Sequence, residues 1–253
     1  MTPVAQPAMS AEKRHPMLLG ARYWTGLSIA SVFGADVGDF ISHYLHLGHW
    51  RGVLPLALVF LLVLRCKRDG WLKAEVAYWV AVVIVRAGAT NLADLASHDL
   101  DLNNPMLITV LALLLILGVA LPLVGTQRLP NDMQPGLPDT RGFYWLNLFV
   151  AGALGTVLGD DMSDRFGLSG ASLLLSALLA CLFLLRQWRL FAGKSGYWTT
   201  VLGARTAGTS VGDLIADQTP LGLAGSTAAI GVLMLVVLMS WKQTDGKRFY
   251  EAS

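Results

Sequence analysis

Long runs of apolar residues alternate along the chain with segments that are apolar but richer in Gly, Ala, Ser and Thr. Three runs are almost uninterrupted, and each approaches the roughly 20 residues that a helix needs to cross a bilayer. A fourth run is shorter. The pattern therefore predicts membrane-spanning helices. The Leu-rich runs are residues 106–125, 168–185, 221–241 and the shorter 53–66.

The segments that precede the Leu-rich runs contain more Gly, Ala, Ser and Thr, and we expect them to occupy a different position among the packed helices. Small residues let helix backbones approach closely in lipid, so we expect these segments to form the interior and the Leu-rich helices to face lipid. The predicted fold is all-α: a polytopic membrane protein of eight transmembrane helices. They form four parallel two-helix repeats around a pseudo-symmetry axis along the membrane normal. The inner helices are predicted at 23–44, 78–98, 144–166 and 197–217.

One spacing occurs in all four small-residue segments. An aromatic–Trp step is followed, fifteen residues after the tryptophan, by an aspartate. Four residues beyond each aspartate stands a second residue of a type that binds metal ions. The tryptophans are Trp24, Trp79, Trp145 and Trp198. The aspartates are Asp39, Asp94, Asp160 and Asp213, and the second residues are His43, His98, Asp164 and Asp217.

The residues around the aspartates share a common core. The segments 34–39, 89–94, 155–160 and 208–213 align without gaps, and the residue before each aspartate is Gly, Ala, Gly and Gly. Only a small side chain there would let a neighbouring helix press against that turn. The four cores, each with its tryptophan, resemble those of bacterial membrane proteins built from four tandem DUF347 repeats. The resemblance covers residues 22–241 and implies the repeat fold, but little function, because that family is largely uncharacterised.

Loop charges predict the orientation. Fifteen Lys and Arg residues lie in the termini and the loops of one side, against two, Arg51 and Arg165, on the other. By the positive-inside rule the first side is cytoplasmic, so both termini are cytoplasmic. The resemblance to bacterial membrane proteins implies that the protein lies in a bacterial inner membrane. The predicted boundaries are a cytoplasmic N-terminal segment 1–20, repeats 21–66, 74–126, 141–186 and 195–241, and a cytoplasmic tail 242–253.

The overall composition also supports a membrane protein. Of 253 residues, 54% are hydrophobic and 14% charged, whereas a soluble domain carries about 25% charged residues. The lipid bilayer is therefore the expected surrounding, and we expect no nucleic-acid partner. The sequence leaves the oligomeric state open.

Helix geometry gives the depth of the aspartates. We expect the four tryptophans to be membrane-interface anchors. Fifteen residues of helix then span roughly 22 Å, which places the aspartates in the outer third of a hydrocarbon core about 30 Å thick. Positions i and i+4 share a helix face, so each aspartate and its second residue can point together toward the axis. Asp36 and Asn91, three residues earlier in repeats one and two, extend this polar face inward.

Two arginines interrupt the apolar interior. Arg86 and Arg205 each lie eight residues before a repeat aspartate, near mid-membrane. An arginine there must pair or meet water. Because repeats two and four are diagonal in a ring, we expect the two arginines to face each other across the axis. They complete a predicted polar pathway with Asp36 and Asn91.

Carboxylates and imidazoles together suit divalent ions such as Mn, Fe, Co, Ni or Zn. The sequence therefore favours a transporter or channel for a small cation, a divalent transition metal first, bound by an Asp/His ring near the extracytoplasmic side. One alternative is a proton-coupled carrier of an anionic solute that uses Arg86 and Arg205. Another is a non-transport protein, either an assembly factor or a haem carrier that uses His43 and His98.

Three further expectations concern catalysis, the aspartates and the histidines of the first outer loop. The chain shows no nucleophile–base pairing, phosphate loop or HExxH motif, so we do not expect an enzyme. The aspartates could also serve only to hold neighbouring helices together. His46 and His49 lie in the first outer loop, and we expect them to be solvated.

Overall fold

The computed structural model describes residues 20–120, 140, 143–188, 190–191 and 193–250. Residues 1–19 of the predicted N-terminal segment lie outside this description, as do residues 121–126 of the predicted second repeat, nearly all of the loop that follows it and the last three residues of the predicted tail. The described residues form helices and contain no strand. The helices are α1 Ala21–Asp39, α2 His49–Arg68, α3 Ala74–Asp94, α4 Asn104–Ala120, α5 Tyr144–Phe166, α6 Leu168–Gln187, α7 Gly193–Gln218 and α8 Gly222–Tyr250.

Four helical stretches are long and apolar enough to cross a membrane, and α4 is a shorter apolar helix. Together with the low content of charged residues, these stretches indicate a membrane protein. The four stretches are His49–Arg68, Glu75–Asp99, Leu168–Gln187 and Gly222–Met239.

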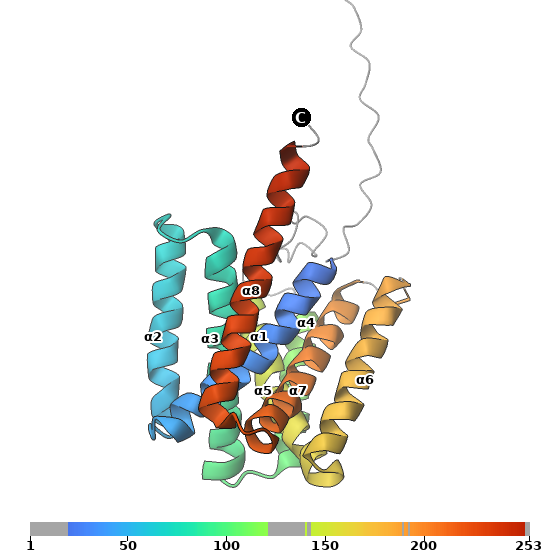
Figure 1. Cartoon of the computed structure of the whole chain (residues 1–253). Helices are drawn as coiled ribbons and strands as arrows, with labels where there is room; N and C mark the ends of the chain where they lie inside the picture. The colour runs from blue at the N-terminus through green and yellow to red at the C-terminus, as the bar shows by residue number, and fades with distance from the viewer. Residues whose placement is uncertain (1–19, 121–139, 141–142, 189, 192, 251–253) are drawn as a thin grey trace, which may run out of the picture.

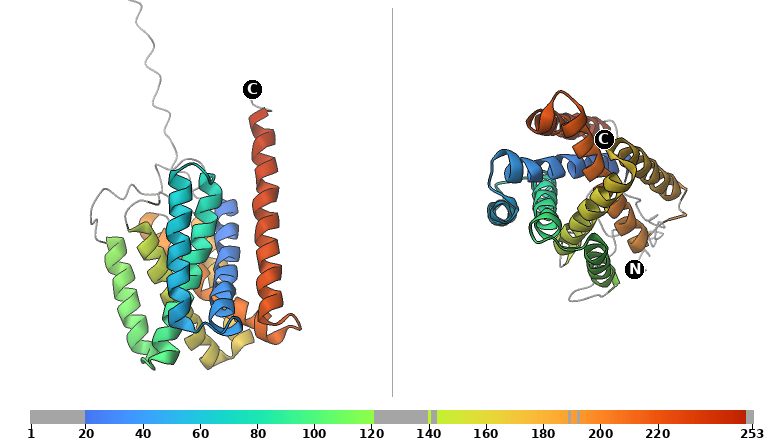
Figure 2. Two further views of the ribbon diagram at one scale, coloured as in Figure 1. Left: turned by 90° about the vertical axis from the view of Figure 1, so that its left-hand side faces the viewer. Right: turned by 90° about the horizontal axis from the view of Figure 1, so that it is seen from below.

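The helices form an inner ring and an outer layer (Figures 1 and 2). Each of α1, α3, α5 and α7 packs against two others of this set, in the closed order α1–α3–α5–α7–α1. The outer helices α2, α4 and α6 pack on α3, α5 and α7, and α8 packs on α1. Only 17–22% of the apolar windows in α2, α6 and α8 is buried, against 72% in α3. The small-residue helices therefore form the interior, and the Leu-rich helices present most of their surface outward.

The inner helices all run in one direction and the outer helices return in the other (Figure 1). The first two inner helices end in short π-helical turns, Phe40–Tyr44 after α1 and Leu95–Asp99 after α3. The aspartates of all four inner helices therefore lie at the same end of the ring, which we call the aspartate end. We call the opposite end, where the inner helices begin, the tyrosine end.

The glycines before the aspartates lie at helix–helix contacts. A β-carbon at Gly38 would lie 2.9 Å from the carbonyl oxygen of Ala87, and one at Gly159 would lie 2.8 Å from the β-carbon of Thr209. At Gly212 a β-carbon would overlap the carboxylate of Asp36. These distances are too short for a side chain, so the expected close approach of neighbouring helices occurs at these positions.

A second layer of close contacts lies one turn nearer the tyrosine end. A β-carbon at Gly34 would lie 2.6 Å from the β-carbon of Arg86, and one at Gly155 would lie 2.6 Å from that of Arg205. A β-carbon at Gly208 would lie 2.7 Å from that of Ser31. Small residues therefore let the two arginine-bearing turns approach their neighbouring helices to backbone distance.

Candidate functional site

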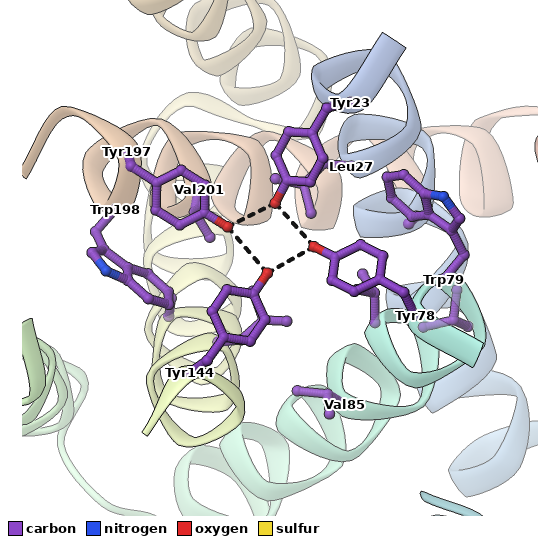
Figure 3. Packing of buried hydrophobic residues seen from close by; sticks show 14 of the residues in the cluster. Tyr23, Leu27, Tyr78, Trp79, Val85, Tyr144, Tyr197, Trp198 and Val201 are labelled. Carbon is purple, nitrogen blue, oxygen red and sulfur yellow. Dashed lines mark hydrogen bonds between the residues drawn. The ribbon is translucent and has the colours of Figure 1, made fainter. Parts of the chain in front are cut away.

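Four tyrosine hydroxyls close the ring at the tyrosine end (Figure 3). Around the square, the oxygen–oxygen distances are 3.0 Å from Tyr23 to Tyr78, 2.7 Å from Tyr78 to Tyr144, 3.1 Å from Tyr144 to Tyr197 and 2.7 Å from Tyr197 to Tyr23. Each side chain is buried. A hydroxyl can donate one hydrogen bond and accept others, so each tyrosine can donate to one neighbour and accept from the next.

Sequence reasoning missed this square, although a signal was present. The residue before each of the four tryptophans is tyrosine. We interpreted the aromatic–Trp step as a membrane-interface feature and gave the first aromatic residue no separate role. A tyrosine at one position of every inner helix, pointing toward a shared axis, would have predicted the square.

The tryptophans lie between helices rather than on the lipid-facing surface where interface anchors were expected. Trp24, Trp79 and Trp198 are 7%, 3% and 7% exposed, and Trp145 is half-buried. Each ring meets the preceding tyrosine edge-on, with centroids 5.1–5.2 Å apart. The cause is local packing: Gly26 leaves room on α1 for the ring of Trp79 from α3.

Arg86 joins all four inner helices near the middle of the ring. Its guanidinium is fully buried and donates to the hydroxyls of Thr90, Thr156 and Thr209 at 2.8, 2.7 and 2.6 Å. It also reaches the carbonyl oxygens of Ser31 and Gly152, at 3.3 Å each. These partners satisfy the donors of a charge that would otherwise be costly to bury.

Arg205 is equally buried but differently surrounded. Its carbonyl oxygen lies 3.5 Å from Nη2 of Arg86, so the two arginines lie close together. None of its three guanidinium nitrogens has a hydrogen-bond partner within the described part of the chain. Arg205 lies within electrostatic range of Arg86 and of the tyrosine square, whereas the four repeat aspartates act on Arg86. Arg205 therefore belongs to the tyrosine end and Arg86 to the aspartate end.

The repeat aspartates gather at the aspartate end. Asp94 is 7% exposed, and the other three are half-buried. Asp94 lies within electrostatic range of Asp39, Asp160 and Asp213. The four carboxylates therefore share one region of the ring, and Arg86 is a buried positive charge that faces all of them.

Three of the predicted ligands form a compact group. Ligand atoms of Asp94, His98 and Asp160 all lie within 4.8 Å of one another. Asp94 and His98 come from α3 and its π-helical turn, and Asp160 comes from α5. The second residues His43, His98, Asp164 and Asp217 are exposed, so this group opens to the surface at the aspartate end.

A histidine pair lies beside this group. His49 is 7% exposed, although its position in a loop predicted that it would be solvated. Its Nδ1 lies 3.0 Å from both carboxylate oxygens of Asp99, and its Nε2 lies 3.4 Å from Nε2 of His43. The chain turns sharply between the two histidines, with positive φ at His46 (53°) and Gly48 (72°), and this turn returns His49 to the end of α1.

Asp36 and Asn91 lie at contacts between helices. Asp36 lies beside Gly212 of α7 and hydrogen-bonds Ser226 of α8. The amide of Asn91 faces Gly52 of α2. Asp36 therefore lies where α1 meets α7 and α8, and Asn91 lies where α3 meets α2.

Part of the chain matches a known repeat family. The family described as "Repeat of Unknown Function (DUF347)" matches residues 196–247, which lie in α7 and α8. No curated protein matches the chain, and no solved structure does.

Proposed function

We propose that this protein is a membrane transporter for a small divalent cation, with a transition metal such as Mn, Zn, Fe, Co or Ni as the favoured ion. The observation that carries the proposal is the group formed by Asp94, His98 and Asp160, whose ligand atoms lie within 4.8 Å of one another. Borderline divalent transition-metal ions bind such a mixture of carboxylate and imidazole ligands, whereas Mg²⁺ and Ca²⁺ prefer oxygen ligands alone.

The charge distribution around this group supports a cation. Four aspartates lie within electrostatic range of one another, and Arg86 is the buried positive charge that acts on all four. Like charges cannot all remain ionised in a desolvated region unless something compensates them. A divalent ion between α3 and α5 would supply that compensation and would also join two neighbouring inner helices.

The layers along the ring favour a carrier over an open channel. A cation that moved from the aspartate end toward the tyrosine end would meet the guanidinium of Arg86, then that of Arg205, and finally the hydroxyl square. Like charges in a low-dielectric interior repel strongly. We therefore propose that the ion is released through a second conformation in which the inner helices separate.

The same proposal includes the number of membrane crossings and the orientation of the chain in the membrane. The chain crosses the membrane eight times as four two-helix repeats, with both termini on the cytoplasmic side of a bacterial inner membrane. The aspartate end, with its exposed histidines and carboxylates, then faces outward and receives the ion.

The test is calorimetric titration of the detergent-purified protein with Mn²⁺, Zn²⁺, Co²⁺ and Ni²⁺. Asp94→Asn combined with Asp160→Asn should weaken binding at least tenfold. The matched control is Asp161→Asn, because Asp161 is the next residue but pairs with the exposed Arg165 at 2.8 Å. Binding that is unchanged in the double variant, or absent from the wild-type protein, would contradict the proposal.

A further inference from the structure

The two buried arginines are not equivalent. Both are 0% exposed, and they lie on α3 and α7. Arg86 donates to three threonine hydroxyls, two of them on neighbouring helices, and to three carbonyl oxygens of neighbouring helices. Arg205 has no hydrogen-bond partner for Nε, Nη1 or Nη2 among the residues described. The structure therefore leaves five N–H donors of one buried guanidinium unused.

A guanidinium remains charged in proteins, so Arg205 cannot relieve its burial by losing a proton. A buried charge without a partner is strongly destabilising, and in the interior of a membrane protein such a residue marks a functional site by default. The need for a counter-charge is greater here because Arg86, which also acts on Arg205, is positive as well.

The immediate surroundings of Arg205 offer donors but no counter-charge. A β-carbon at Gly155 would lie 2.6 Å from the β-carbon of Arg205, so α5 and α7 are close-packed there. Tyr23, Tyr78 and Tyr144 lie within electrostatic range of Arg205 from the tyrosine end. A hydroxyl can turn to donate a hydrogen bond outside the square, so the tyrosines could join Arg205 around an anion.

We propose that Arg205 binds a small monovalent anion, of the size of chloride, between the tyrosine square and Arg86. One negative charge matches the one unpaired guanidinium, and a spherical ion can accept hydrogen bonds from any direction. A larger polyvalent oxyanion would be more costly to dehydrate among close-packed helices. This site lies on the opposite side of Arg86 from the repeat aspartates and goes beyond the proposed cation transport.

The experiment measures binding of radioactive chloride to the detergent-purified full chain by equilibrium dialysis. The wild-type protein should bind chloride saturably, and Arg205→Met should weaken the affinity at least tenfold. Arg165→Gln is the control, because that arginine is exposed at the aspartate end and pairs with Asp161. Arg205→Lys, which keeps the charge, should retain more affinity than Arg205→Met.

A second measurement does not depend on any variant. Replacing chloride by gluconate at constant ionic strength should lower the melting temperature of the wild-type protein, since a ligand that binds only the folded state stabilises it. An unchanged melting temperature together with no saturable chloride binding would overturn the proposal, and so would full affinity in Arg205→Met. Protection by phosphate but not by chloride would overturn the monovalent class. The double variant Asp94→Asn with Asp160→Asn should leave chloride binding intact. The result of the chloride test is therefore independent of the result of the cation test.

Discussion

The hydroxyl oxygens of Tyr23 and Tyr197 lie 2.7 Å apart, although 174 residues separate the two tyrosines in the sequence. Tyr23 is on α1 and Tyr197 is on α7, the first and last helices of the inner ring. Their contact closes the hydroxyl square (Figure 3), and α8 packs on α1 to close the outer layer. The first and last inner helices are thus joined by a buried polar contact.

Removal of one hydroxyl from the square should destabilise the protein measurably. Tyr78→Phe deletes the contacts to Tyr23 and Tyr144, at 3.0 and 2.7 Å. Because both partners stay buried, we expect a loss of about 1–3 kcal/mol in the free energy of unfolding. Denaturation in detergent checks this, with Tyr44→Phe as the control, since that tyrosine is 56% exposed. Equal stability of the two variants would show that the square contributes little.

The close approach of α1 and α3 should not tolerate a methyl group. In Gly34→Ala the new β-carbon would lie 2.6 Å from that of Arg86, so one helix must shift. Overpacking of this kind costs about 1–3 kcal/mol. The control is Gly88→Ala, whose β-carbon would meet a ring atom of Phe149 at an ordinary 3.6 Å. Thermal unfolding should separate the two variants, and a Gly34→Ala protein as stable as the control would refute the packing argument.

Arg86 should be sensitive even to a substitution that keeps its charge. Lysine has a single ammonium group and cannot reproduce the planar fork that reaches Thr90, Thr156 and Thr209. Each lost hydrogen bond to the charged group is worth about 1.5–3 kcal/mol. We expect Arg86→Lys to lower stability by at least that amount, whereas the exposed Arg65→Lys should change it little. The same unfolding midpoint for both variants would contradict this role of the Arg86 hydrogen bonds.

Period and spacing in the sequence predicted much of the fold. The small-residue segments became the inner helices, and the glycines of the aspartate cores lie where neighbouring helices touch. Spacing also brought Asp94, His98 and Asp160 to one end, because residues four apart share a helix face. These features follow from rules that act within one helix or between adjacent ones.

Other features depend on where separate helices meet, and sequence reasoning predicted these features differently. The ring of Trp79 turned inward because Gly26 on the adjacent helix α1 leaves room for it. His49 is buried because positive φ at His46 and Gly48 returns the chain onto α1. The difference between Arg86 and Arg205 could not be predicted either, since it depends on threonines of α5 and α7 that reach one arginine and not the other.

The metal content of the purified protein tests the central claim most directly. After incubation with Mn²⁺ or Zn²⁺ and removal of excess ion, elemental analysis should find about one divalent ion per chain, as expected for one site that opens to the surface. A chelator should remove the ion, Asp94→Asn with Asp160→Asn should not retain it, and Asp161→Asn should retain it fully. A wild-type protein that holds no more divalent metal than the double variant would contradict the account.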